Sequence, residues 1–99
     1  MISVKHLQIL AAVTRSGSVT AAAKQLNVSQ PTASKALRRL EDVAGTPLFE
    51  RMDGRMMPTT EALILAREAN HLIDEWGTYQ NLITNISRRS GDRLRVAAS

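Results

Sequence analysis

The stretch LNVSQPTAS, residues 26–34, decides the fold, because it ends one predicted helix, turns the chain and begins another. Asn27 stands where the chain must turn, and asparagine, after glycine, most readily adopts the left-handed backbone conformation. Ser29 is a favourable N-cap, and Pro31 follows in the first turn, where a missing N–H costs nothing and the fixed φ favours helix. The stretch therefore predicts two short helices held at a fixed angle by a tight corner.

Hydrophobic periodicity predicts three short helices around this corner. The first runs from Val4 to Thr14 and ends at the residues RSGS. Ser18 caps the second, whose apolar residues follow helical spacing as far as Leu26. The third begins after Ser29 and ends at Gly45. Its predicted inward stripe comprises Ala33, Ala36, Leu37, Leu40 and Ala44.

A hairpin is predicted after the third helix. Asp53-Gly54 lies between the short segments Leu48–Met52 and Arg55–Met57 and is typical of a two-residue hairpin turn. Pro58 is expected to close the second strand, because proline cannot donate to a ladder.

A long helix is predicted next, from Thr59 or Thr60 to about Arg89, and the residues SGD at 90–92 are expected to end it. Its apolar residues alternate three and four apart, as in a coiled coil. This heptad pattern comprises Ala62, Leu65, Ala69, Leu72, Trp76, Tyr79, Ile83 and Ile86. Some thirty residues span about 45 Å, longer than a small domain can cover. A homodimer formed through Leu65, Ala69, Leu72, Trp76, Tyr79, Ile83 and Ile86 is the simplest cover, with the two aromatic residues interpreted as packing rather than base-stacking groups.

Composition limits the class of protein. The 99 residues, 43% of them apolar, suit one small domain with an extension. The sequence has no cysteine, which excludes disulfides and thiolate metal sites, and its apolar runs are too short to span a membrane. A cytoplasmic protein without membrane association is therefore expected. Residues 1–58 carry eight Lys and Arg against four Asp and Glu, whereas residues 59–99 carry five of each, so an anionic partner is expected at the first part.

Catalysis and cofactor binding are not expected. The two histidines, His6 and His71, lie in separate helices with no nucleophile motif around either, and no glycine-rich phosphate loop occurs. His71 stands among Glu68, Asp74 and Glu75, a spacing that ordinary helix ion pairs explain better than a metal site. The sequence therefore predicts neither an enzyme nor a metal or other cofactor.

The polar surface of the third helix favours double-stranded DNA as the partner. Glutamine, serine, lysine and arginine side chains can bond base edges in a major groove. The residues expected to read bases are Gln30, Pro31, Thr32, Ser34, Lys35 and Arg38. Those expected to contact the DNA backbone are Ser18 and Ser29 at helix starts, and Arg51 and Arg55 in the hairpin, which could also probe a minor groove. Without the hairpin, a bundle whose polar face merely meets water would explain the helices equally well.

A family resemblance agrees with this interpretation. Residues 18–51, SVTAAAKQLNVSQPTASKALRRLEDVAGTPLFER, resemble the winged helix-turn-helix of the LysR-type bacterial transcription regulators, and the match extends from about residue 3 to residue 89. The resemblance implies that Gln30, Pro31, Ser34 and Lys35 meet bases, that Arg51 and Arg55 lie in the wing, and that the long helix joins two chains. It also implies that the dimer binds an interrupted inverted repeat.

The last residues, RLRVAAS at 93–99, resemble the first strand of that family's effector-binding domain. The expected organisation is a winged helix-turn-helix over residues 1–58, a dimerising linker helix over 59–89 and the start of a truncated effector-binding domain over 90–99. Any small-molecule effector would act only through that further domain, and a higher oligomer is expected of the longer protein.

The predicted fold class is therefore mainly α, with three helices and a two-stranded hairpin followed by a long dimerisation helix. Two alternatives stay open. One is a coiled-coil protein-interaction module with a basic head that is not specific for DNA. The other is a different winged-helix family that dimerises in another way.

Overall fold

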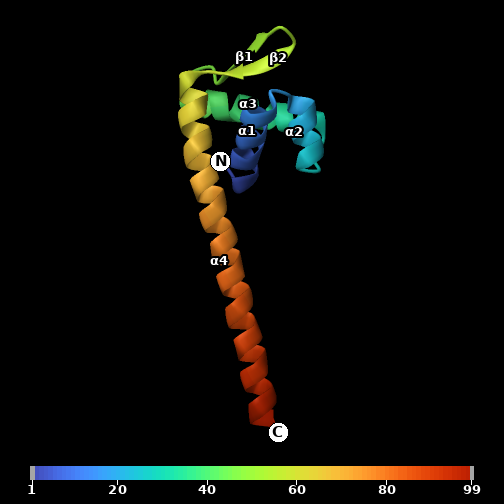
Figure 1. The fold of residues 1–99 in the computed structure, drawn as a ribbon, viewed down its shortest axis with the longest axis vertical. Coiled ribbons are helices and arrows are strands. Elements are labelled where there is room, and N and C mark those ends of the chain that lie inside the picture. Colours follow the sequence, from blue (N-terminus) through green and yellow to red (C-terminus); the bar gives the residue numbers. More distant parts are fainter. Residues whose placement is uncertain (1, 99) are drawn as a thin grey trace.

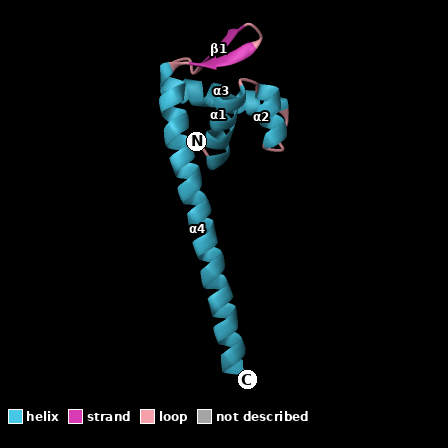
Figure 2. Ribbon diagram, viewed as in Figure 1, coloured by secondary structure: helices cyan, strands magenta, loops and turns pink. Residues whose placement is uncertain are grey.

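Six elements make up the computed structural model, which describes the backbone of residues 2–98 and the side chains of residues 2–90. In chain order they are α1 (Val4–Ser16), α2 (Val19–Gln25), α3 (Gln30–Ala44), β1 (Phe49–Met52), β2 (Arg55–Pro58) and α4 (Thr60–Ala98). The short helices and the hairpin gather around one end of α4, and the rest of α4 extends away from them (Figure 1). The molecule measures 66 × 23 × 21 Å. The prediction of a mainly helical chain with one hairpin is confirmed, as Figure 2 shows by element type.

The corner between α2 and α3 forms as its residues predict. Ser18 Oγ accepts a hydrogen bond from the backbone N–H of Ala21 (3.1 Å), and Ser29 Oγ accepts one from Thr32 (3.2 Å). Asn27 adopts the left-handed conformation with φ of 57°. Each side-chain cap satisfies one of the backbone donors that a helix start leaves unpaired. Local chemistry therefore places both helix starts.

The hairpin turns at Asp53 and Gly54, whose φ angles of 50° and 75° are both positive, as a two-residue type I′ turn requires. The strands pair antiparallel, with Phe49 opposite Pro58 and Met52 opposite Arg55. The hairpin is also tied to the helices, because the backbone N–H of Met56 donates to the carbonyl oxygen of Gly17 (2.9 Å). Gly17 ends α1.

The core lies where α1, α2 and α3 meet under the base of the hairpin. Its largest fully buried side chains are Ile9, Leu10, Val13 and Leu48. Ala22 and Ala33 are buried between them, since short helices that cross closely need small side chains at the contact.

The prediction that Ala44 belongs to the inward stripe of α3 is wrong. Ala44 is exposed, because it borders an open groove between the end of α3 and α4. The apolar pattern is periodic to the end of the helix, but the packing against α1 and α2 ends a turn earlier, at Leu40.

The long helix begins as predicted and ends later than predicted. Thr59 Oγ1 accepts a hydrogen bond from the N–H of Ala62 (3.3 Å), which makes Thr59 the cap. The helix then continues to Ala98, through residues 90–92, where the sequence predicted a break. A helical glycine costs only about 1 kcal/mol relative to alanine, and the residues RLRVAA that follow are mostly good helix formers.

The strand expected over residues 93–99 is therefore absent from residues 93–98, and residue 99 lies outside the described residues. The division of the chain at residues 58 and 89 stays a prediction. None of the helices in the described part of the chain is long and apolar enough to cross a membrane.

Candidate nucleic-acid interface

The residues predicted to read bases lie together on the first three turns of α3. Five of the six side chains are exposed, and Ser34 is half-buried. The exposed ones are Gln30, Pro31, Thr32, Lys35 and Arg38. The opposite side of the helix, at Ala33, Ala36 and Leu37, is buried in the core. A helix held by its apolar stripe and polar at its free N-terminal turns has the geometry that enters a major groove.

A hydrogen bond within α3 orients the side chain best suited to base recognition. Gln30 Nε2 donates to Ser34 Oγ (3.0 Å), one helical turn further on. A glutamine amide has two N–H donors and an acceptor oxygen, so this bond leaves one N–H and Oε1 available. A glutamine uses that pair of groups when it binds adenine through N6 and N7. Ser34 therefore orients the Gln30 amide and leaves one of its N–H groups and Oε1 available.

The two serines predicted to contact the DNA backbone are both helix caps, but they differ in their exposure and in the hydrogen bonds that their hydroxyl groups make. Ser29 Oγ donates to Thr32 Oγ1 (2.8 Å) in addition to its capping bond. Because a phosphate oxygen only accepts hydrogen bonds, Thr32 is better placed than Ser29 to donate to it. Ser18 is half-buried and caps α2 beside Gly17.

The two wing arginines lie on opposite faces of the hairpin. Arg51 stands opposite Met56, which packs against the core, whereas Arg55 stands opposite the exposed Met52. Directly opposed residues of an antiparallel pair share a face. The two arginine side chains therefore cannot both contact DNA from the same face of the hairpin.

Arg55 is held by the end of α1. A Cβ atom built on Gly17 would lie 3.0 Å from Arg55 Nη2 and 3.1 Å from Nε, so the guanidinium packs directly on the Gly17 backbone. The sequence placed Arg55 in the hairpin, and the structure brings its guanidinium beside the start of α2, a contact that no local pattern encodes.

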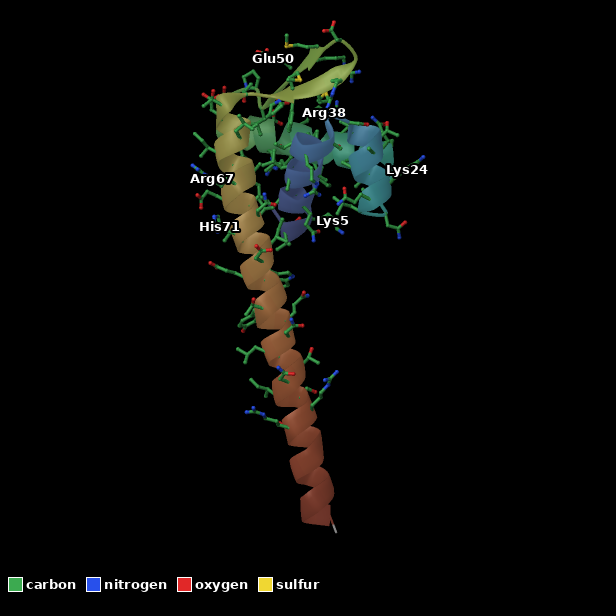
Figure 3. The ribbon with its side chains drawn as sticks, viewed as in Figure 1. Lys5, Lys24, Arg38, Glu50, Arg67 and His71 are labelled. Carbon is green, nitrogen blue, oxygen red and sulfur yellow. The ribbon has the colours of Figure 1, made fainter. Side chains whose placement is uncertain are left out.

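Sequence reasoning missed a cleft of about 600 Å³ between α1 and α3. Lys5 and Arg39, which were not predicted to bind DNA, line it together with Thr32, Lys35 and Arg38. Figure 3 shows Lys5 on α1 and Arg38 on α3. Helical spacing puts Arg39 one turn after Lys35, but only the packing of α1 on α3 brings Lys5 to the same cleft.

The long helix carries an exposed apolar stripe beyond this interface. Six of the seven residues predicted to join two chains are exposed: Leu65, Leu72, Trp76, Tyr79, Ile83 and Ile86. Ala69 is only 1% exposed, because the helix packs against α1 at this point. The Trp76 and Tyr79 rings stack with centroids 6.4 Å apart.

His71 is exposed on α4. Within the described residues, no three or more His, Cys, Asp or Glu side chains are grouped so as to hold a metal ion.

Three helices, a capped and exposed third helix and a hairpin beside it define a winged helix-turn-helix DNA-binding domain. Residues 4–63 match the family described as bacterial regulatory helix-turn-helix proteins, lysR family. The chain therefore belongs to the LysR family.

Named relatives and solved structures agree with this assignment. The chain is 39% identical over 95 residues to the HTH-type transcriptional regulator DgcR of Pseudoalteromonas sp., covering 96% of this chain and 33% of DgcR. It resembles the CbnR DNA-binding domain in complex with DNA, with a TM-score of 0.70, 31% identity and coverage of 98% and 99% of the two chains. It also resembles the BenM DNA-binding domain bound to benA site 1 DNA, with a TM-score of 0.77, 27% identity and coverage of 86% and 96%.

The chain is thus a LysR-type DNA-binding domain of a transcriptional regulator and not an enzyme. It spans about a third of the length of DgcR.

Proposed function

We propose that two copies of this chain bind double-stranded DNA at an interrupted inverted repeat, with α3 of each copy in a major groove. The observation that carries the proposal is the exposed N-terminal surface of α3, where Gln30 is oriented by Ser34. The DNA complexes of the CbnR and BenM domains, which share this fold, support DNA as the partner.

The proposed contacts divide by what each group can recognise. The base-reading set is Gln30, Pro31, Thr32, Ser34, Lys35 and Arg38. The backbone set is Ser18, Ser29, Arg51 and Arg55, and Thr32, whose hydroxyl accepts from Ser29, could also donate to phosphate. Base contacts give sequence preference, whereas phosphate contacts position the protein and make binding depend on salt.

The exposed stripe of α4 supports dimer formation. Leu72, Trp76 and Tyr79 remain about half exposed, and Leu72 and Leu65 also line an apolar groove of about 230 Å³ between α4 and the short helices. Soluble proteins rarely leave so continuous an apolar surface uncovered. A second copy covers it with the same surface, and the two-fold symmetry of such a pair would set two reading helices on two half-sites.

The longer regulator would add the response to a signal. This chain spans 33% of DgcR. In a longer regulator, a small-molecule effector would act through a further domain, and the complete protein would form a higher oligomer.

Selection of bound sequences from a random duplex pool tests the proposal. Enrichment of an interrupted inverted repeat is the expected result. The half-sites should stand about one helical turn, or roughly 34 Å, apart unless the DNA bends. A basic protein-interaction module would instead retain all duplexes alike, and that outcome would reject sequence-specific binding.

A further inference from the structure

The cleft between α1 and α3 combines an apolar floor with a basic rim. Its floor includes Ile9, which is buried, and Ala36, which packs against the core from α3. Its rim carries four cations, Lys5 from α1 and Lys35, Arg38 and Arg39 from α3, and among the side chains that the structure describes Asp42 is the one acidic residue that lines it. All five charged side chains are exposed. A concave surface lined mostly by one sign of charge concentrates the potential that attracts an anion.

The α1 side of the cleft is held in place by a hydrogen-bonded cap. The backbone N–H of Ser3 donates to His6 Nδ1 (3.1 Å), and Ser3 Oγ lies 2.8 Å from the same nitrogen. When Nδ1 accepts the backbone bond, the neutral imidazole carries its proton on Nε2, which is then a donor. Both residues line the cleft, so these hydrogen bonds hold the start of α1 at the position from which the Lys5 side chain projects.

The cleft is continuous with the reading surface of α3. Thr32, Lys35 and Arg38 belong to both, because the cleft opens along one flank of the helix that carries the proposed base contacts. A major groove is about 12 Å wide and a helix with its side chains is about 10–12 Å across. A helix in the groove therefore has a phosphate strand close to each flank.

We propose that the cleft holds the sugar-phosphate backbone of the DNA strand beside α3, with Lys5 and Arg39 as phosphate contacts. This inference rests on the proposed function and deepens it by assigning a second, sequence-independent contact surface. Cations from two helices would reach the strand from both sides, which neither helix achieves alone.

The double variant Lys5→Ala/Arg39→Ala tests the proposal in salt titrations of the 99-residue chain. Affinities for the selected duplex and for a random duplex would be measured across a salt series, with Arg67→Ala as the control. Arg67 is an exposed cation on α4, outside the cleft (Figure 3). The slope of log K against log salt should fall by about 0.9 for each lost contact, or about 1.8 per protomer. Both duplexes should be weakened alike, so their affinity ratio stays unchanged.

Two further variants separate the effect of charge from the effect of side-chain bulk: Arg39→Lys keeps the positive charge, and Asp42→Asn removes a negative charge with almost no change in size. Arg39→Lys should keep the wild-type slope, because phosphate attraction needs the charge. Asp42→Asn should strengthen binding to both duplexes. The inference is overturned if the double variant matches Arg67→Ala, or if Arg39→Lys lowers the slope by about 0.9, as the loss of one phosphate contact would. Failure of the proposed function would look different, since the wild-type chain itself would then show no preference for any duplex.

Discussion

Shortening Leu72 should weaken the proposed dimer by an amount that follows from the exposure of this side chain. Leu72 is 52% exposed in the single chain, so a partner can bury about half of it. Full burial of a leucine side chain contributes about 1.5–3 kcal/mol, and half of that is about 0.8–1.5 kcal/mol per chain. In a two-fold symmetric dimer each chain contributes one Leu72, so the two contributions add. Leu72→Ala should therefore weaken dimerisation by about 1.5–3 kcal/mol, or about 10- to 150-fold in Kd.

Leu63→Ala is the matched control, because Leu63 is also 52% exposed and lies on the same helix, but off the predicted stripe. Sedimentation equilibrium would give the dimer dissociation constant of each variant. Emission from Trp76, the only tryptophan, provides a second readout, since this side chain is 44% exposed in the single chain and should shift to the blue when a partner buries it. Leu72→Lys, which puts a charge into the interface, should give monomers with red-shifted emission.

Equal weakening by Leu72→Ala and Leu63→Ala would refute the assignment of the stripe. A Leu72→Lys variant that stays dimeric with unchanged emission would refute it as well. Either result would mean that something other than a second copy of this stripe covers α4.

Further predictions concern the reading helix and the wing. Gln30→Ala should cost about 1–3 kcal/mol on the selected duplex and less on random DNA in binding titrations, and equal losses would make Gln30 a positioning residue. Ser34→Ala, which removes the bond that orients Gln30, should show a smaller loss of the same kind. Gly17→Ala and Gly45→Ala introduce similar backbone strain, since their φ angles are 71° and 72°, and each should lose about 1–2 kcal/mol in denaturant unfolding. Only Gly17→Ala displaces Arg55, so it alone should also weaken DNA binding; equal DNA affinity of the two variants would show that this contact is irrelevant to binding.

Residues close in sequence determine the corners of this fold. The Ser18 and Ser29 caps, the left-handed Asn27 and the Asp53-Gly54 turn all form as their sequence predicts. Each depends on a side chain or a backbone conformation within three residues, so a local pattern is sufficient to place it. The apolar stripe of α3 is likewise set by helical spacing, except at Ala44, which is exposed because the packing of α3 against the core ends at Leu40.

The heptad pattern of α4 does not by itself predict which residues the same chain covers. Ala69 and Leu72 belong to the same pattern, but the packing of α4 on α1 buries Ala69 and leaves Leu72 half exposed. Periodicity shows that a helix face is apolar, but it does not show whether the same chain or another one covers it. The helix end is a similar case, because weak breakers at residues 90–92 do not stop a helix that good helix formers continue.

Only the tertiary structure decided which distant charges meet. Arg55 packs on Gly17, and Lys5 shares a cleft with Arg39, although each pair is separated by more than thirty residues in the sequence. The sequence by itself determined the helices, the turn and the polar surface of α3, because those depend on neighbouring residues. The position of Arg55 and the basic cleft depend on how closely α1 approaches the hairpin and α3, and buried side chains from every part of the core set that distance together.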